Sequence, residues 1–383
     1  FTLILICSTN FYRKYSIMSM KRRMTMKIFV TAGGSMGHIN PALAIIDEFK
    51  KREKNVEVFY FGTHNRMEKD LIPKLGYTYI PLEVYGFSKN ILLDMKNIRL
   101  VKKAITVCRE WIKKEHPDIV IGVGGYVTYP VVVAAHKEHI PIFIHEQNSI
   151  PGKSNKMVSK YADLIGVTFE SSKKYFKTKG KIIYTGHPCG AWALKTPKKK
   201  KQELGLDPAK RLVTVVAGSQ GSGSLNDKMK DYLMSLKTKN YEVCYITGKY
   251  HYDEYRQNKF PKNVHLFPYM DELPGLLKIS DIVLSRAGAG SLFEILALKV
   301  PSIIIPSPNV ANNHQYYNAL ELAKKDCIYL LEESTITTAK ITESIENLLN
   351  NEELRLKLKV NMDKEDVQES ASIIYEKIKE LIS

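Results

Sequence analysis

Short runs of apolar residues alternate with longer amphipathic stretches along most of the chain after residue 26. The runs have the length of buried strands, and the stretches between them carry apolar residues at helical spacing. This alternation is typical of parallel β/α units. A first set of strands is expected at Lys27–Thr31, Val56–Phe61, Asp118–Gly122, Ile142–His145 and Leu164–Val167, with Ile182–Tyr184 leading out of the set.

A second set of strands is expected at Leu212–Ala217, Glu242–Thr247, Val264–Phe267, Ile282–Ser285 and Ser302–Ile305. A polar stretch at 195–201 separates the two sets, and a chain of 383 residues is long enough for two hydrophobic cores. The pattern therefore predicts an α/β protein of two Rossmann-like, doubly wound domains that face a cleft. The expected domains are 27–187 and 188–362, and a C-terminal helix within 363–383 is expected to pack back on the first domain.

Residues 1–26 do not fit this pattern. Their apolar run, Phe1–Cys7, is much shorter than the roughly 20 residues of a spanning helix, and it lacks a leading basic region. Neither a membrane span nor a signal peptide is therefore expected here. We expect an extraneous or disordered N-terminal segment, with Met24 or Met26 as the natural start.

The composition is that of a globular and strongly basic protein. Hydrophobic residues make up 44% and charged residues 25% of the chain, and the net charge is +17, of which the first 26 residues supply +5. Such a charge favours an anionic partner, which could be nucleic acid, a phosphorylated substrate or a membrane surface. The five cysteines are scattered without Cys-x-x-Cys spacing, as expected in a reducing compartment.

Three of the expected strands run into glycine-rich turns, at residues 33–41, 122–126 and 218–223. In the first turn, Asn40 as the cap and Pro41 as the first helical residue are expected to begin a helix. Ligands of doubly wound sheets bind beyond the carboxyl ends of the strands, where glycine-rich turns present amides to phosphate. Phosphate groups are therefore predicted on both sides of the cleft.

Another turn of small residues, Ser285–Gly290, leads into an apolar helix that contains Glu294. A helix start of this kind offers free amides to an anion, and a carboxylate one turn later can accept hydrogen bonds from a sugar diol. Together with Asn313–Asn318, this turn predicts a pocket for a nucleotide diphosphate sugar. Ser291 and Glu294 also fit a capping box, in which Glu294 would bond only to its own helix terminus.

In order and spacing, these motifs resemble the MurG family of UDP-N-acetylglucosamine transferases over nearly all of residues 27–383. The residues that carry the resemblance are Gly33–His38, Gly124–Tyr126 with Pro130, His145–Asn148 with Pro151–Gly152 and Asn155–Lys156, Gly218–Gly221 with Leu225–Asn226, Ser285–Glu294, and His314–Gln315 with Asn318–Ala319. The resemblance implies the GT-B fold and inverting transfer of N-acetylglucosamine from UDP-N-acetylglucosamine to the 4-hydroxyl of lipid I, the undecaprenyl-diphospho-N-acetylmuramoyl pentapeptide, to give lipid II in peptidoglycan synthesis. Two positions depart from the family pattern, because Met36 stands where a small residue is common and no Arg follows Pro188.

The resemblance also implies donor-binding residues in the second domain, namely Ser219, Gln220, Met270, Ala289, Gly290, Ser291, Glu294, His314 and Gln315. Glu294 would bind the ribose, the amides of 289–291 would hold the diphosphate and stabilise the leaving UDP, and the backbone at Met270 would contact the uracil. Ser219 and Gln220 would contact the donor phosphates near the uridine. His314 and Gln315, the His-Gln pair, would recognise hydroxyls of the transferred sugar. Two structural alternatives stay open, since Met270 also fits a core residue and the His-Gln pair also fits a polar helix start.

On the acceptor side the resemblance implies binding residues in the first domain, namely Gly34, Ser35, Gly37, Gly124, Gly125, Tyr126, Glu146 and Asn148. His38 is the candidate general base, because an imidazole with a pKa of about 6.5 can take a proton from a sugar hydroxyl at neutral pH. Alternatively, His38 only caps the helix or bonds to the diphosphate. Residues 145–148 could likewise form a structural polar network.

No obligate cofactor or metal is expected, since amides and a helix dipole can hold the nucleotide; Mg²⁺ would at most stimulate turnover. The expected partners are UDP-N-acetylglucosamine, lipid I and an anionic membrane surface, with other cell-wall synthesis proteins as further candidates and no nucleic acid. The segment 84–116 carries eight basic and three acidic residues, interleaved with Phe87, Ile91, Leu92, Leu93, Leu100, Trp111 and Ile112. It predicts a peripheral enzyme on the cytoplasmic face of the cell membrane, with an ordinary helix packed on the first sheet as the alternative.

Three other functions compete with this interpretation. A related GT-B transferase could act on a different lipid such as diacylglycerol, and an epimerase of the same fold could act on the nucleotide sugar without any lipid. A nucleic-acid or membrane-binding module would use only the positive charge, and it would bind DNA with a steep dependence on salt. Residues His145–Asn148 and the acceptor loop argue against the diacylglycerol transferase, and an acceptor screen decides between it and lipid I transfer.

Overall fold

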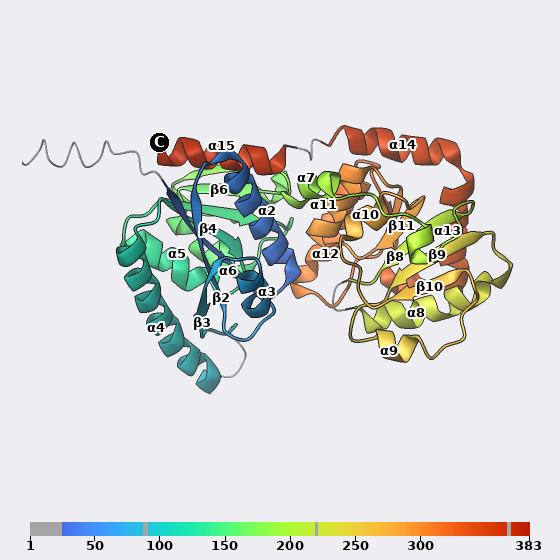
Figure 1. Ribbon diagram of the computed structural model, residues 1–383, viewed down its shortest axis with the longest axis horizontal. Helices are drawn as coiled ribbons and strands as arrows, with labels where there is room; N and C mark the ends of the chain where they lie inside the picture. Colours follow the sequence, from blue (N-terminus) through green and yellow to red (C-terminus); the bar gives the residue numbers. More distant parts are fainter. Residues whose placement is uncertain (1–24, 87–90, 219–220, 366–368) are drawn as a thin grey trace, which may run out of the picture.

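The computed structural model describes residues 25–86, 91–218, 221–365 and 369–383. Several predictions concern residues outside these ranges, namely those for residues 1–24, Phe87, Lys89, Ser219 and Gln220, and no side chain of 91–94 is described. Within the described ranges the chain forms two parallel sheets with helices packed on both faces of each (Figure 1). The predicted α/β class with two doubly wound sheets is confirmed.

The first sheet has seven parallel strands in the order β3-β2-β1-β4-β5-β6-β7. Its strands are β1 (Met26–Ala32), β2 (Val56–Thr63), β3 (Thr78–Leu82), β4 (Ile119–Gly124), β5 (Ile142–Glu146), β6 (Leu164–Val167) and β7 (Lys181–Tyr184). The strand order reverses between β1 and β4, which pair directly. The turns 33–37 and 124–126 therefore both lie at the switch point, where doubly wound sheets bind ligands.

Alternate residues of the strands supply two cores in this half. Ile28 and Val30 of β1 lie in a buried cluster with α2 and α3, whereas Phe29 between them lies in a cluster with α4, α5 and α6. Strands buried on both faces in this way need helices on both sides. The helices are α2 (Met36–Arg52), α3 (Glu68–Lys74), α4 (Ile91–Glu115), α5 (Thr128–Lys137) and α6 (Lys153–Val158), with 3₁₀ turns η1 (Ser159–Tyr161) and η2 (Glu170–Tyr175).

The second sheet has six parallel strands in the order β10-β9-β8-β11-β12-β13. Its strands are β8 (Arg211–Val216), β9 (Tyr241–Ile246), β10 (Val264–Phe267), β11 (Ile282–Ser285), β12 (Ser302–Ile304) and β13 (Tyr329–Leu330). Its order reverses between β8 and β11, so the turns after these two strands share the second switch point. The helices of this half and of the connection to it are α7 (Cys189–Lys195), η3 (Gln202–Leu204), α8 (Gly223–Met234), η4 (Ser235–Thr238), α9 (Tyr252–Tyr255), α10 (Leu273–Leu277), α11 (Ala289–Leu298), η5 (Ala311–Asn313), α12 (His314–Ala323), η6 (Glu333–Thr335) and α13 (Thr338–Asn350).

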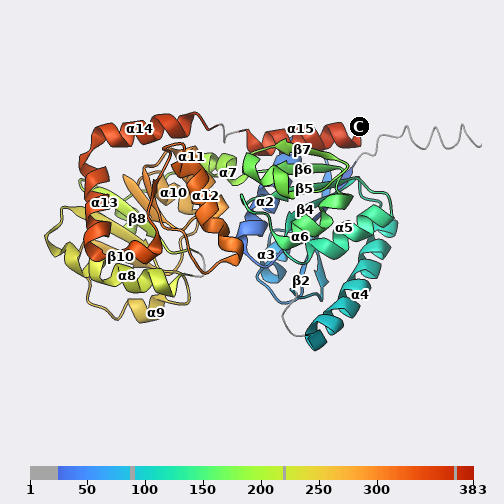
Figure 2. The ribbon, with the colours of Figure 1, turned by 180° about the vertical axis from the view of Figure 1, so that it is seen from behind.

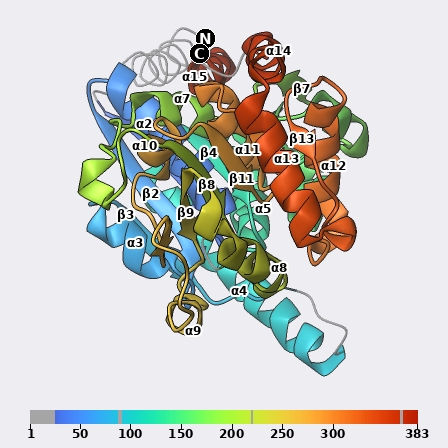
Figure 3. The ribbon, with the colours of Figure 1, turned by 90° about the vertical axis from the view of Figure 1, so that its right-hand side faces the viewer.

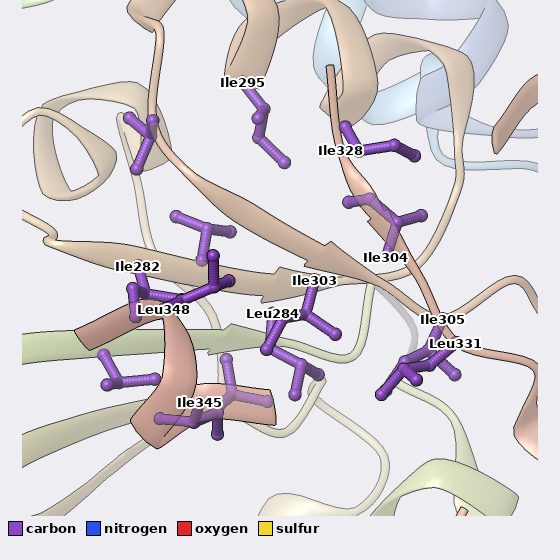
Figure 4. Close-up of a cluster of buried hydrophobic side chains, with 14 of the residues drawn as sticks. Ile282, Leu284, Ile295, Ile303, Ile304, Ile305, Ile328, Leu331, Ile345 and Leu348 are labelled. Atoms are coloured by element: carbon purple, nitrogen blue, oxygen red, sulfur yellow. The ribbon is translucent and has the colours of Figure 1, made fainter. Parts of the chain in front are cut away.

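The largest core of the second half is built mainly from branched aliphatic side chains (Figure 4). Leu284 of β11 and Ile303 of β12 lie on the side of the sheet that Ile345 of α13 covers, and Ile295 of α11 belongs to the same cluster from the other side. Because α11 is anchored through such buried residues, its first turn is held firmly against the end of β11.

The last two helices connect the halves. α14 (Glu352–Asp363) lies on the second half, and α15 (Ser370–Ile382) lies against α2 of the first half (Figures 1 and 2). Ile374 of α15 belongs to the same buried cluster as α2, and the Tyr375 ring lies 5.1 Å from that of Phe49. The Tyr375 hydroxyl also donates to Glu53 at 2.8 Å. The domain boundaries predicted at 26, 187 and 362 stay predictions.

Two details of the predicted elements were wrong. α2 begins at Met36, not after Asn40, and Pro41 lies inside it. The helix tolerates Pro41 because the carbonyl that loses its partner belongs to exposed Gly37, where water can bond to it. The strands β3 and β13 were not predicted, since β3 contains a proline and β13 has only two residues.

Candidate active site

His38 lies near the start of α2, at the switch point of the first sheet. Its Nδ1 lies 3.0 Å from the carbonyl oxygen of Gly33. Because a carbonyl only accepts, Nδ1 carries the proton, and Nε2 of the neutral ring keeps its lone pair. Burial lowers the pKa of His38 below its ordinary value, although the Gly33 hydrogen bond and the Glu146 charge oppose this effect. His38 is therefore neutral at pH 7, and Nε2 can accept a proton.

The His38 ring packs against the turn that follows β4. A Cβ added to Gly124, which has a φ of +117°, would lie 2.7 Å from the His38 ring. A Cβ added to Gly125 would lie 2.5 Å from the Gly33 carbonyl oxygen, and the Gly33 amide donates to Gly124 at 3.3 Å. Glycine is required here because the two turns pack backbone to backbone. The structure thus brings together His38, Gly124 and Gly125, and half-buried Tyr126 follows directly.

A buried carboxylate, Glu68, lies behind the first glycine-rich turn. Its Oε1 accepts hydrogen bonds from the Gly34 amide at 3.3 Å and from the amide and hydroxyl of Thr63 at 3.1 and 2.6 Å. The Gly34 amide is thus engaged by the protein and contributes to the shape of the turn. Ser35 occupies the N-cap position of α2 without a side-chain capping bond, and Gly37 is exposed.

Glu146 organises the loop between β5 and α6. Its Oε1 accepts from the amide and the side chain of Asn148 at 2.9 and 3.2 Å. Its Oε2 accepts from the Gly152 amide at 3.2 Å and from Asn155 Nδ2 at 2.9 Å. Four hydrogen bonds within the loop support the polar network that the sequence left open. A contact of Glu146 with the acceptor stays a prediction.

The first turn of α11 presents amides that have no partner. Gly288 is the N-cap residue, and the Leu292 amide makes the first bond of the helix, to the Gly288 carbonyl at 3.0 Å. In the described part of the chain no acceptor is found for the amides of Ala289, Gly290 and Ser291. Such first-turn amides, with the positive end of the helix dipole, suit a phosphate group.

Glu294 lies in the middle of α11 and is half-buried; burial raises its pKa to about 7. Since Gly288 and not Ser291 caps the helix, Glu294 is too far from the terminus for a capping box, and that alternative is wrong. Two neighbours were missed by the sequence analysis, namely Cys189 of α7 and Tyr269. Burial chiefly raises the pKa of each, and the charge of nearby Glu294 adds to the effect.

The His-Gln pair begins α12 and is already partly bonded to the protein. Nδ1 of His314 donates to the carbonyl oxygen of Ala311 at 2.8 Å, so Nε2 of His314 is left for a ligand. Oε1 of Gln315 accepts from the amides of Ala287 and Ser307 at 3.2 and 2.9 Å. Only Nε2 of Gln315 could therefore contact a sugar hydroxyl. The Met270 side chain is buried in a core cluster, so its predicted role can involve only the backbone.

Arg286 lies buried behind the donor turn and connects three segments. Its guanidinium donates to the carboxylate of Glu333, to the hydroxyls of Ser222 and Ser224, and to the Ile305 carbonyl. Ser222 belongs to the glycine-rich turn after β8 and Ser224 to the first turn of α8, so Arg286 fixes the start of α8 against the start of α11. Arg286 had no predicted role, although a charged residue within a turn of small residues was a usable signal.

The two halves meet where α12 passes the loop between β5 and α6. Asn318 of α12 is buried and hydrogen-bonds to Asn148 and Ser149 of that loop and to the Ala287 carbonyl. His38 lies close enough to α12 for the His314 charge to affect its pKa. The predicted residues around His38, Asn148 and the start of α12 therefore lie in one region.

α4 contains most of the predicted membrane segment. Ile112 is buried and Trp111 packs against the first core, so these two cover the sheet, as the alternative of a helix packed on the first sheet expects. Met95 and Ile98 are instead 55% and 46% exposed. Arg109 is paired with Glu138, whereas within the described part of α4 the exposed basic residues without an ion pair to a described residue are Lys96, Arg99, Lys102 and Lys103.

Neither a metal cluster nor a membrane span is found in the described ranges. No group of three or more His, Cys, Asp or Glu side chains there has metal-binding geometry. None of the helices in these ranges is both long and apolar enough to span a bilayer.

Comparison with known proteins places these features in a family. Residues 28–167 match the glycosyltransferase family 28 N-terminal domain, and residues 212–376 match the glycosyltransferase family 28 C-terminal domain. The chain is 39% identical over 336 residues to the UDP-N-acetylglucosamine–N-acetylmuramyl-(pentapeptide) pyrophosphoryl-undecaprenol N-acetylglucosamine transferase of Halalkalibacterium halodurans, covering 85% of this chain and 91% of that protein.

Solved structures share the fold at lower identity. MurG of Acinetobacter baumannii is similar with a TM-score of 0.73 and 22% identity, covering 93% of this chain and 99% of that one. The UDP-GlcNAc 2-epimerase of Neisseria meningitidis, solved with UDP-GlcNAc, is similar with a TM-score of 0.67 and 17% identity, covering 93% and 100%. These two likenesses establish the GT-B fold, whereas the sequence matches identify the family. The chain therefore belongs to glycosyltransferase family 28, in its MurG branch.

Proposed function

We propose that this chain transfers N-acetylglucosamine from UDP-N-acetylglucosamine to the 4-hydroxyl of lipid I, giving lipid II and UDP. The observation that carries the proposal is the 39% identity, over 85% of the chain, to a transferase named for these substrates. The unpartnered amides of α11 on one side and a neutral His38 on the other agree with it. Both are groups that an inverting displacement requires.

His38 is the proposed general base. The acceptor hydroxyl attacks the anomeric carbon of the donor sugar, the bond from that carbon to the UDP oxygen breaks, and the hydroxyl proton passes to Nε2. The Gly33 carbonyl holds the Nδ1 proton, so it stabilises the imidazolium that forms. One displacement inverts the configuration at the anomeric carbon.

The donor is proposed to bind along α11. The amides of 289–291 and the helix dipole hold the diphosphate, and they stabilise the charge that develops on UDP as the bond breaks. Glu294 accepts the hydroxyls of the ribose, and Nε2 of Gln315 contacts the transferred sugar. The proposed site needs no obligate metal, and stimulation by Mg²⁺ can be tested with and without chelator.

The direct test is to incubate the protein with labelled UDP-N-acetylglucosamine and a lipid I analogue. We expect labelled lipid II, and we expect UDP-glucose and UDP-N-acetylgalactosamine to be poor donors. Formation of a labelled lipid only with diacylglycerol would favour the alternative transferase. Conversion of UDP-N-acetylglucosamine without any acceptor would favour an epimerase, whose fold is shared.

We further propose that the N-terminal part of α4 holds the enzyme on the cytoplasmic face of an anionic membrane. The described end of α4 projects beyond the neighbouring elements (Figure 3). Met95, Ile98, Arg99 and Lys102 follow helical spacing, so they share one exposed face. Apolar side chains flanked by basic ones suit the headgroup region of a bilayer, near the lipid tail of the acceptor.

Binding to vesicles tests this surface. We expect Lys96→Glu with Arg99→Glu and Lys102→Glu to weaken sedimentation with anionic vesicles about a hundredfold, since each basic residue contributes roughly 1 kcal/mol. The matched control reverses three exposed lysines of the second half, Lys230, Lys237 and Lys359. Equal losses in the two triple variants would mean that net charge alone, and not α4, determines binding.

A further inference from the structure

Asn318 connects the two halves of the protein through a single buried amide. Its Oδ1 accepts from the amide and the hydroxyl of Ser149 at 2.8 and 2.9 Å. Its Nδ2 donates to Asn148 Oδ1 at 3.1 Å and to the Ala287 carbonyl at 3.4 Å. Asn318 and Ala287 belong to the second half, whereas Asn148 and Ser149 belong to the loop after β5. We call these four residues the Asn318 latch.

The orientation of the Asn318 amide is fixed by its partners. The Ser149 backbone amide can only donate and the Ala287 carbonyl can only accept, so Oδ1 must face Ser149 and Nδ2 must face Ala287. All four hydrogen-bonding positions of the amide are filled. With no exposed surface, the side chain has no water to replace a lost partner.

The latch lies between two groups of functional residues. On the acceptor side, Asn148 is held by Glu146 through its amide and its Nδ2, and its Oδ1 is held by Asn318. On the donor side, Ala287 directly precedes the turn into α11, and its amide donates to Gln315. A chain of hydrogen bonds thus runs from Glu146 to the donor turn through Asn318.

We propose that Asn318 is a positioning residue that sets the acceptor loop relative to the donor turn. It does not contact the reacting atoms. Instead, the position of the Ala287 turn, which changes its environment when a nucleotide binds to α11, is transmitted to Asn148 and Ser149. The proposal rests on the proposed function only for its kinetic consequence, since the coupling itself is a property of the folded chain.

Two substitutions separate the two sides of the latch. Asn318→Ala removes all four hydrogen bonds, whereas Asn318→Asp keeps an oxygen for Ser149 and loses both donations from Nδ2. The matched control is Asn263→Ala, because Asn263 is also buried, but its side chain donates only to carbonyls of the second half, among them Leu236 and Tyr241. If the role of Asn318 were purely structural, Asn318→Ala, Asn318→Asp and Asn263→Ala would have the same effect on hydrogen exchange at the Ser149 amide.

The rate of hydrogen exchange at the Ser149 amide measures how firmly the Asn318 latch holds that amide, and it does not depend on enzymatic activity. We expect exchange about tenfold faster in Asn318→Ala and unchanged in Asn263→Ala. UDP should slow the exchange in the wild-type protein, but it should have no effect on it in Asn318→Asp, which has lost the link to Ala287. If UDP slows the exchange equally in Asn318→Asp, or if Asn318→Ala leaves it unchanged, the proposal is wrong.

Steady-state kinetics supply the second readout. We expect kcat for lipid II formation to fall about ten- to a hundredfold in Asn318→Asp, with the dissociation constant of UDP within about threefold of wild type. A wild-type kcat in that variant would overturn the positioning role. If the wild-type protein transfers no sugar but exchange at Ser149 responds as expected, the proposed function is wrong and the positioning role of Asn318 is still supported. If Asn318→Ala does not fold, Ser149→Ala, which loses one hydrogen bond, replaces it in the exchange experiment.

Discussion

The two walls of the site are built in different ways. On the first wall three amides of the glycine-rich turns are used by the protein itself, since Gly33 donates to Gly124, Gly34 donates to Glu68, and Gly124 donates to Thr128. On the second wall the first three amides of α11 have no acceptor among the described residues. The first wall therefore uses part of its turn amides within the protein, and those of Gly125 and Tyr126 have no acceptor among the described residues, whereas the second wall keeps all three first-turn amides for a ligand.

Burial acts on the key side chain of each wall in opposite directions. It lowers the pKa of His38 and raises the pKa of Glu294 to about 7, so it favours the uncharged form of both. An uncharged imidazole is what a general base requires, whereas an uncharged carboxyl is a poorer acceptor for ribose hydroxyls. Changes on the first wall should therefore mainly impair chemistry, and changes on the second wall should mainly impair binding.

The largest expected effect is that of His38→Ala. We expect kcat to fall about a hundredfold to ten-thousandfold, with little change in the donor KM, because general-base catalysis is lost while the donor wall is intact. Because the base must be unprotonated and burial lowers its pKa, wild-type activity should be lost only as the pH falls below 6.5. Turnover within tenfold of wild type in this variant would remove His38 from the mechanism.

A glycine-to-alanine pair sharpens the comparison at intermediate size. At Gly124 an added Cβ would collide with the His38 ring, whereas at Gly290 the nearest atom, in His187, would lie at an ordinary 3.8 Å. We expect Gly124→Ala to lower kcat at least tenfold and to destabilise the free protein, since its φ is also positive. Gly290→Ala should leave the melting temperature unchanged. Equal melting temperatures for the two variants would contradict the close packing of the first wall.

The smallest expected effect is on nucleotide affinity through Glu294. We expect Glu294→Gln to weaken UDP binding about tenfold at pH 8, as hydrogen bonds to a charged acceptor are lost. In the wild-type protein the affinity should decrease as the pH falls through about 7, while the variant should be insensitive to pH over this range. Calorimetry at pH 6 and 8 measures both.

The same carboxyl makes a separate prediction for the free protein. Since its pKa is raised above the ordinary 4.5, it contributes stability that is fully present below pH 4.5 and is lost as the pH rises through about 7. The wild-type protein should therefore lose stability relative to Glu294→Gln across this interval. A constant difference between the two unfolding curves would mean that Glu294 titrates normally.

Much of the fold followed from the apolar runs, because strands buried on both faces leave an almost continuous hydrophobic signal. Leu164–Val167, Val264–Phe267 and Ile282–Ser285 have the predicted bounds. The start of α2 differs from the prediction. Pro41 suggested a start at residue 41, but the Ser35 carbonyl accepts from the amides of His38 and Ile39, and these bonds begin the helix earlier.

The contacts between residues of the site were harder to predict from the sequence than the identity of those residues. The proximity of Cys189 to Glu294 and the bonds of Asn318 to Ser149 join residues about a hundred or more positions apart, which no local pattern encodes. Sequence also could not say that Gln315 Oε1 and the Gly34 amide are already engaged. Motifs indicate which residues gather at a strand end, but the hydrogen bonds left for a ligand depend on the assembled structure.

The return of α15 to the first half has a consequence for synthesis on the ribosome. Tyr375 and Ile378 complete the cluster that buries the outer side of α2, yet Tyr375 is made 322 residues after Glu53 at the end of that helix. Because chains are built from the N-terminus, Phe49 and its neighbours stay uncovered until α15 has been made. The nascent first half must therefore keep an apolar strip open to solvent or chaperones until α15 emerges from the ribosome.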